Sequence, residues 1–148
     1  MHYLERLLAY VKRAEQATQA AKETVLREVG LTPAQQTALA AINDAPGITA
    51  AELARRCAVT PQTTNSLVGR LQGRGLVERS PHPLHGTLIE LRLTEHGRAL
   101  FARADALVAK LDADLSAALS PTELDTLRDL LTRVAVRAVE TTGGAAAR

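Results

Sequence analysis

The sequence predicts a mainly α-helical protein with one small β-hairpin. Long segments at both ends of the chain repeat apolar residues every three to four positions, which is the period of an amphipathic helix. Two shorter segments in the middle begin at Thr49 and Thr60, residues of the type that cap helices. After them, apolar and charged residues alternate in 89–93, which is typical of a half-buried strand.

Length and composition limit the choices. The chain has 148 residues, of which 46% are hydrophobic, so it can bury a core without disulfides. Its formal net charge of +2 says little about an anionic partner. Cys57 is the single cysteine, charges interrupt the first residues where a signal peptide would be apolar, and no apolar run is long enough to span a membrane. We therefore expect a cytoplasmic protein that does not enter a membrane.

The N-terminal part of the chain is predicted to form two helices. The first is amphipathic and ends near Gly30. Its apolar face comprises Leu4, Leu7, Leu8, Val11, Ala14, Ala17, Ala21, Val25 and Val29. Thr32 and Gln35 then form a capping box around Pro33, which opens the second helix. That helix is expected to end at 44–47, where proline and glycine break the pattern.

The next two helices are short and joined by a tight turn. Thr49 is expected to cap the first, with the Glu52 side chain bonding back to it. After a two-residue turn, Thr60 offers a second cap and Pro61 a favourable first helical residue. Helices joined by so short a turn must cross, as in a helix-turn-helix, which presents its second helix to a DNA groove. We therefore predict that the helix beginning at Thr60 reads DNA.

Residues 76–79 and 87–93 are predicted to be the two strands of the hairpin. Two prolines and Gly86 mark the loop between them. A hairpin directly after a recognition helix is a wing, so the middle of the chain is predicted to be a winged helix-turn-helix.

The helices at both ends carry more apolar surface than one small module needs. A second long helix is expected from Thr94 to Ser120, where a further capping box with Glu123 opens the last helix. This surplus indicates a homodimer formed through the terminal helices; the alternative is that these helices pack on their own winged module. The expected parts are an N-terminal dimerisation helix at 1–30, a winged helix-turn-helix DNA-binding domain at 31–98, C-terminal dimerisation helices at 99–142 and a flexible tail at 143–148.

One side of the predicted recognition helix is polar. At about 100° per residue, Thr64, Leu67, Val68 and Leu71 fall on the inner side. Gln62 and Asn65 on the outer side can pair with adenine, Ser66 with either class of base edge, and Arg70 with guanine or a phosphate. The N-terminal end of this helix suits a phosphate oxygen. The residues of this helix predicted to contact DNA are Thr60, Pro61, Gln62, Thr63, Asn65, Ser66 and Arg70.

Basic residues gather around this helix. Between Arg55 and Arg79 there are five arginines and a single acid, Glu78. Such a stripe is typical of a surface that tracks phosphates, although a solvated basic face has the same composition. Gly69 and Gly73 cost helix stability, which favours a close approach to the DNA backbone; for Gly73, fraying at the helix end is an equal alternative.

The segment LARRCAVTPQTTNSLVGRLQGRGLVER, followed by LRLTEHGR, resembles the MarR family of bacterial transcription regulators. The phrase RLQGRGLVER and the LT-x-x-G after the wing are its most specific parts, and the flanking helices match the family's dimerisation arms. The resemblance implies a homodimeric repressor that binds a pseudo-palindromic operator in double-stranded DNA. It also implies a small-molecule effector, often aromatic or phenolic, bound between the dimerisation helices and the winged module.

The wing tip departs from the family pattern. The resemblance implies a minor-groove contact, usually through an Asp-x-Arg motif, whereas residues 80–87 read SPHPLHGT and contain no arginine. We expect His85 to take the arginine's place, with Arg79 and Thr87 as further contacts. The alternative is a mobile loop whose histidines never reach the duplex.

Other chemistry has little support in the sequence. Cys57 falls where the first short helix needs a core residue, so we expect a buried small hydrophobe rather than a redox sensor. His82, His85 and His96 lack the spacing of metal ligands. Because no nucleophile has an oriented base, we predict no enzyme, no cofactor and no metal. The predicted function is sequence-specific transcription regulation; the alternative is a dimeric winged-helix module that binds protein and no operator.

Overall fold

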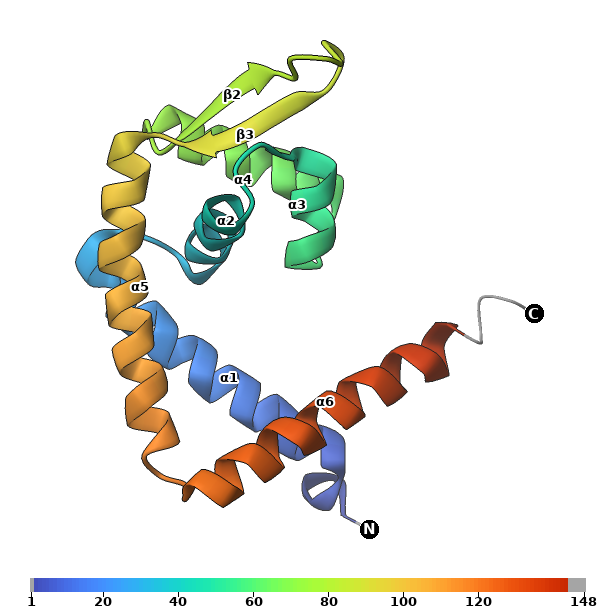
Figure 1. Ribbon diagram of the computed structural model, residues 1–148. Coiled ribbons are helices and arrows are strands. Elements are labelled where there is room, and N and C mark those ends of the chain that lie inside the picture. The colour runs from blue at the N-terminus through green and yellow to red at the C-terminus, as the bar shows by residue number, and fades with distance from the viewer. Residues whose placement is uncertain (1, 144–148) are drawn as a thin grey trace. The chain divides into compact units, whose positions relative to one another are not determined.

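The computed structural model describes residues 2–143, and in these residues it is mostly helical with one small sheet (Figure 1). This confirms the predicted fold class. The elements in chain order are η1 (Tyr3–Glu5), α1 (Leu7–Leu26), η2 (Arg27–Val29), α2 (Pro33–Asp44), β1 (Ile48–Thr49), α3 (Ala50–Cys57), α4 (Pro61–Gly73), β2 (Val77–Pro81), β3 (Ile89–Leu93), α5 (Glu95–Ser116) and α6 (Pro121–Gly143). The tail predicted at 143–148 lies outside the described residues from position 144 onward.

The chain divides into two compact units, Met1–Leu111 and Asp112–Arg148. The first contains the helix-turn-helix, the sheet, α1 and most of α5. The second contains the end of α5 and α6, and no described residue of α6 is buried. None of the helices in residues 2–143 is long and apolar enough to cross a membrane.

Side-chain caps begin the helices where the sequence placed them. Thr32 and Gln35 form the full capping box of α2, and Ser120 and Glu123 form that of α6. At α4, the Thr60 hydroxyl oxygen accepts the N–H of Thr63 at 3.1 Å. These caps satisfy backbone donors that have no partner inside the helix.

The cap of α3 differs from the expectation. Thr49 accepts the N–H of Glu52 at 3.2 Å, but the Glu52 carboxylate does not bond back to Thr49. It binds Arg55 and Arg56 instead, which lie three and four residues along the same helix. That spacing brings side chains together on a helix surface, and Thr49 itself belongs to a strand.

The sheet has three antiparallel strands in the order β1-β3-β2. The sequence predicted only β2 and β3. In β1, Ile48 pairs with Leu91 and Thr49 with Glu90. The observed strand bounds also differ from the predicted 76–79 and 87–93. Strand β2 extends to Pro81, which pairs with Ile89, and β3 begins at Ile89. Pro81 is tolerated because β2 lies at the edge of the sheet.

The core of the first unit extends beyond the helix-turn-helix. Its centre is formed by fully buried residues of α2, α3, α4 and the sheet, among them Leu39, Leu53, Leu71 and Leu91. Leu26 from α1 and Ala104 from α5 are equally buried in the same cluster. The core of the winged module is therefore completed by residues of α1 and α5. This packing fixes the orientation of these parts of α1 and α5 relative to the winged module.

Candidate nucleic-acid interface

The turn between α3 and α4 is held by backbone bonds. Ala58 adopts a left-handed conformation with φ of 53°, which is uncommon for a residue other than glycine. Its N–H donates to Arg55 O, and the N–H of Val59 donates to Ala54 O at 3.1 Å. The chain thus reverses within a few residues and starts α4 at an angle to α3, as the helix-turn-helix requires (Figure 1).

Helix α4 has one buried and one exposed side. Thr64, Val68 and Leu71 are buried in the core, and Leu67 is half-buried. The exposed residues include Thr60, Pro61, Gln62, Thr63, Asn65, Ser66, Gly69 and Arg70. The residues predicted to contact DNA on this helix are thus all accessible, and their contacts stay a prediction.

The five arginines of the predicted basic stripe have different surroundings. Arg55 and Arg56 share the carboxylate of Glu52, and hydrogen bonds from these two arginines lower the pKa of Glu52. Arg74 donates to the carbonyl of Gly30 at 2.9 Å, where it braces the junction of α1 and α2.

Arg70 and Arg79 are exposed, and neither forms an ion pair with a carboxylate of the described residues. These two guanidinium groups therefore keep their charge available for phosphates.

The wing tip contains hydrogen bonds that the sequence did not predict. His85 and Thr87 are exposed, as is Leu84, of which 83% is accessible. His82 is half-buried, and its Nδ1 accepts the N–H groups of both Leu84 and His85, each at 3.1 Å. Sequence reasoning missed this role, because a histidine between two prolines carries no recognised turn signal.

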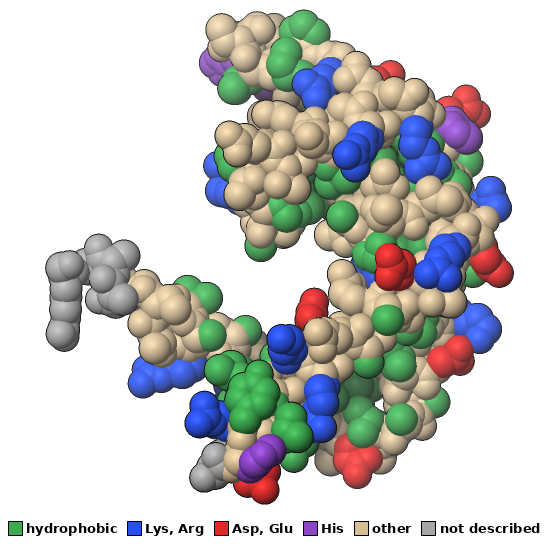
Figure 2. Space-filling view, turned by 180° about the vertical axis from the view of Figure 1, so that it is seen from behind, with side chains coloured by type: hydrophobic (Ala, Val, Ile, Leu, Met, Phe, Trp, Pro, Cys, Tyr) green, Lys and Arg blue, Asp and Glu red, His purple; other side chains and the backbone are tan. Residues whose placement is uncertain are grey.

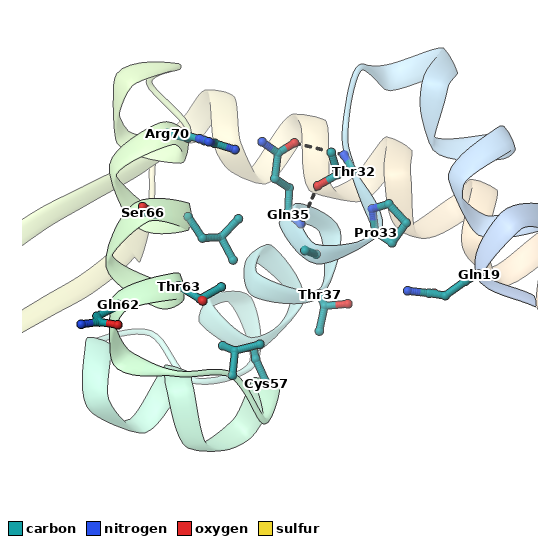
Figure 3. A pocket seen from close by; sticks show the side chains of 13 residues that line it. Gln19, Thr32, Pro33, Gln35, Thr37, Cys57, Gln62, Thr63, Ser66 and Arg70 are labelled. Carbon is teal, nitrogen blue, oxygen red and sulfur yellow. Dashed lines mark hydrogen bonds between the residues drawn. The ribbon is translucent and has the colours of Figure 1, made fainter. Parts of the chain in front are cut away.

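A cavity of about 650 Å³ lies between α1, the start of α2 and the inner flank of α4 (Figure 3). Gln19 of α1 and Thr37 of α2 face Thr63 and Arg70 of α4 across it, and Arg70 points toward Gln35. The remaining lining residues are Thr32, Pro33, Ala34, Gln35, Cys57, Val59, Gln62, Ser66 and Leu67. Most of the lining residues are polar in type, although apolar atoms make up much of the wall; none of them is aromatic, and Arg70 is the one charged side chain among them.

Cys57 lies at the edge of this cavity. It packs against the core, as expected, but it is only half-buried and also lines the cavity wall. Burial raises the pKa of the Cys57 thiol, which keeps it protonated at neutral pH. Within the part of the chain that the structure describes, no group of three or more His, Cys, Asp or Glu residues is arranged to hold a metal ion.

Known proteins are similar to this chain in sequence and in fold. The MarR family profile matches residues 29–86. The transcriptional repressor Rv2887 of Mycobacterium tuberculosis is 38% identical over 95 residues, which are 64% of this chain and 68% of the repressor. The chain belongs to the MarR family. Family relatives are transcription regulators rather than enzymes.

Solved structures of MarR-family proteins superimpose on most of this chain. The repressor CouR bound to a 23-mer DNA duplex is 31% identical with a TM-score of 0.83, over 88% of this chain and 93% of CouR. Rv2887 in complex with salicylic acid is 30% identical with a TM-score of 0.69, over 87% of this chain and 96% of Rv2887. Of these two relatives with the same fold, one has thus been solved with DNA and the other with a small organic molecule.

Proposed function

We propose that this protein is a ligand-responsive transcription repressor that binds a pseudo-palindromic operator as a homodimer. The observation that carries the proposal is the exposed polar side of α4, where Gln62, Asn65 and Ser66 are accessible on a winged module. These side chains have the donors and acceptors that distinguish base edges in the major groove. The relationship to CouR, whose structure contains a DNA duplex, supports the same use of this surface.

The phosphate contacts are proposed to come from α4 and the wing. Thr60 and Thr63 stand at the N-terminal end of α4, where free backbone N–H groups attract an anion. Arg79 on β2 is exposed and unpaired by acids among the described residues. His85 and Thr87 are the proposed contacts of the wing tip with the minor groove. Phosphate contacts set position and affinity, while the α4 side chains set sequence preference.

The dimer is proposed to form through the terminal helices. Large apolar side chains of the first residues remain exposed in the single chain, and they gather at its N-terminal end (Figure 2). They include Leu7 at 58% and Leu8 at 76% exposure, and on α6 Val139 is 70% exposed. Large apolar side chains that stay exposed in this number are normally covered by a partner. A two-fold dimer would place two α4 helices on half-sites about one helical turn apart.

The cavity beside α4 is the proposed effector site. Its volume of about 650 Å³ is in the range of small-molecule pockets. Arg70 is the charged group in its wall and the hydroxyls and amides around it can bind oxygen atoms, so a small organic anion fits it best. Rv2887 has been solved with such a molecule, salicylic acid. A ligand here would act by favouring one arrangement of α4 relative to α1 over another.

Selection of bound sequences from random DNA duplexes tests the proposal. A repressor of this kind should enrich a reproducible palindrome, and its affinity should fall steeply as salt rises. A winged-helix module that binds only protein would leave duplex DNA unbound even at low salt, and that result would refute the proposal. We further propose that the protein acts in the cytoplasm and catalyses no reaction.

A further inference from the structure

The imidazole ring of His82 accepts two backbone hydrogen bonds of the wing tip. His82 stands between Pro81 and Pro83. Its own N–H donates to Leu88 O at 2.8 Å, which extends the strand pairing past Ile89. Its Nδ1 accepts two backbone N–H groups, those of Leu84 and His85, at 3.1 Å each. Since Pro83 has no N–H, these are the first two amides after His82 that need an acceptor.

We propose that His82 is the positioning residue of the wing and that it holds Leu84 and His85 in place for the minor groove. The inference rests on the proposed DNA-binding function. Leu84 and His85 are exposed at the tip, and each donates its backbone N–H to the same ring. A tip held in this way does not have to be ordered when DNA binds, so the wing makes its contact at lower entropic cost. The order that a free loop lacks is supplied here by a side chain.

The two accepted bonds define the protonation state of the ring. Nδ1 can accept N–H groups only when it carries no proton, so the neutral ring must hold its proton on Nε2. Nε2 lies 3.7 Å from Glu90 Oε1 on β3, and the other oxygen of that carboxylate binds Arg92 at 3.1 Å. The His85 ring is the remaining titratable group against His82, with 5.2 Å between ring centroids.

Protonation of His82 therefore acts on the tip in a defined direction. A proton on Nδ1 places a third donor against the two N–H donors of Leu84 and His85 and removes both bonds. Glu90 faces Nε2 and so cannot replace the acceptor at Nδ1. Among the described residues the His85 ring accepts neither of these amides, so a change confined to the His85 side chain would leave the turn intact.

Two substitutions of similar size separate these roles. In His82→Asn, the side-chain oxygen can take the place of Nδ1, since asparagine accepts N–H groups two and three residues ahead in turns. In His82→Gln, the amide keeps a donor toward Glu90, while the acceptor moves one carbon farther from the backbone. His82→Ala removes both groups. His85→Ala is the matched control, because it removes a proposed DNA contact and keeps the ring that forms the turn.

The experiment measures hydrogen-exchange protection of the Leu84 and His85 amides by NMR, and affinity for the selected operator, in the full-length dimer. His82→Asn should keep both near the parent values. His82→Gln and His82→Ala should lose the protection and bind DNA about tenfold more weakly. A loss of this size corresponds to the stabilisation of the tip by one or two hydrogen bonds.

The outcomes are separable from those of the proposed function. Equal protection in His82→Asn and His82→Gln would overturn the positioning role. Lost protection with unchanged operator affinity would overturn the link to DNA. A parent protein that binds no duplex would refute the proposed function and with it the DNA half of this inference, while the exchange data would still decide whether His82 holds the turn.

Discussion

Replacing Gly97 with alanine should destabilise the winged module. Gly97 is buried in the first turn of α5, and its N–H donates to the Thr94 hydroxyl at 2.9 Å. A Cβ atom built on its backbone would overlap the carbonyl oxygen of Leu76 and lie 2.9 Å from the carbonyl carbon. That carbonyl also accepts the N–H of Thr94 at 3.1 Å. The glycine of the LT-x-x-G motif is therefore required because α5 and the end of the α4–β2 turn touch backbone to backbone.

The size of the effect follows from what has to move. Leu76 is fully buried and the overlapping atom belongs to the backbone, so no side chain can rotate away. Separating α5 from Leu76 costs about 1–3 kcal/mol of overpacking, occasionally more. It also weakens the Thr94 hydrogen bond, worth about 1 kcal/mol, while alanine regains about 1 kcal/mol of helix propensity. The free energy of unfolding should therefore fall by roughly 1–3 kcal/mol.

Urea unfolding followed by circular dichroism measures this change, at one fixed protein concentration because dimer stability depends on concentration. Gly69→Ala is the matched control. It lies within α4, and a Cβ atom there has nothing within 4 Å. The control should unfold at a slightly higher urea concentration than the parent. Its free energy of unfolding should be higher by up to about 1 kcal/mol. A Gly97→Ala protein as stable as the parent would refute the steric reasoning.

Three further predictions concern DNA reading, the cavity and assembly. Gln62→Ala should weaken operator binding by about 1–3 kcal/mol and relax the preference at one base pair. Arg79→Ala should instead weaken binding to all sequences alike. An unchanged selected motif in Gln62→Ala would mean that another face reads DNA. Because burial raises the pKa of Cys57, its alkylation at pH 7.5 should be slower than in the urea-unfolded chain and should accelerate as pH rises; equal rates would contradict the burial. Leu8→Glu should shift the protein from dimer to monomer in light scattering, and a normal dimer would place the interface elsewhere.

Local signals in the sequence predicted the helix starts well. Thr32, Thr60 and Ser120 each cap a helix as expected, because a cap involves only residues within one turn of each other. The predicted bond from the Glu52 side chain back to Thr49 was wrong, because two arginines on the same helix bind the Glu52 carboxylate instead. Strand β1 was missed because two residues cannot show a period, and its pairing partner Leu91 is far along the chain.

The polar side of α4 was also predictable, since a 100° projection needs only the sequence of one helix. The cavity was not. Gln19, Thr37 and Cys57 come from three helices and share no spacing, so only the packing of α1 and α2 brings them together. The role of His82 depends on the position of one ring nitrogen relative to two amides, which no residue pattern encodes.

Arg70 links the two proposed activities of α4 through a single side chain. In this structure its guanidinium points into the cavity toward Gln35, while Gln62, which also lines the cavity, extends away from the other lining side chains (Figure 3). An anion in the cavity would bind Arg70 there, and a DNA phosphate or guanine would require it to turn outward. The two ligands would then compete for one cation, in addition to any effect of the ligand on the arrangement of α4 relative to α1. Since such coupling is reciprocal, an effector that lowers operator affinity by a given factor must itself be bound more weakly by the same factor when the operator is occupied.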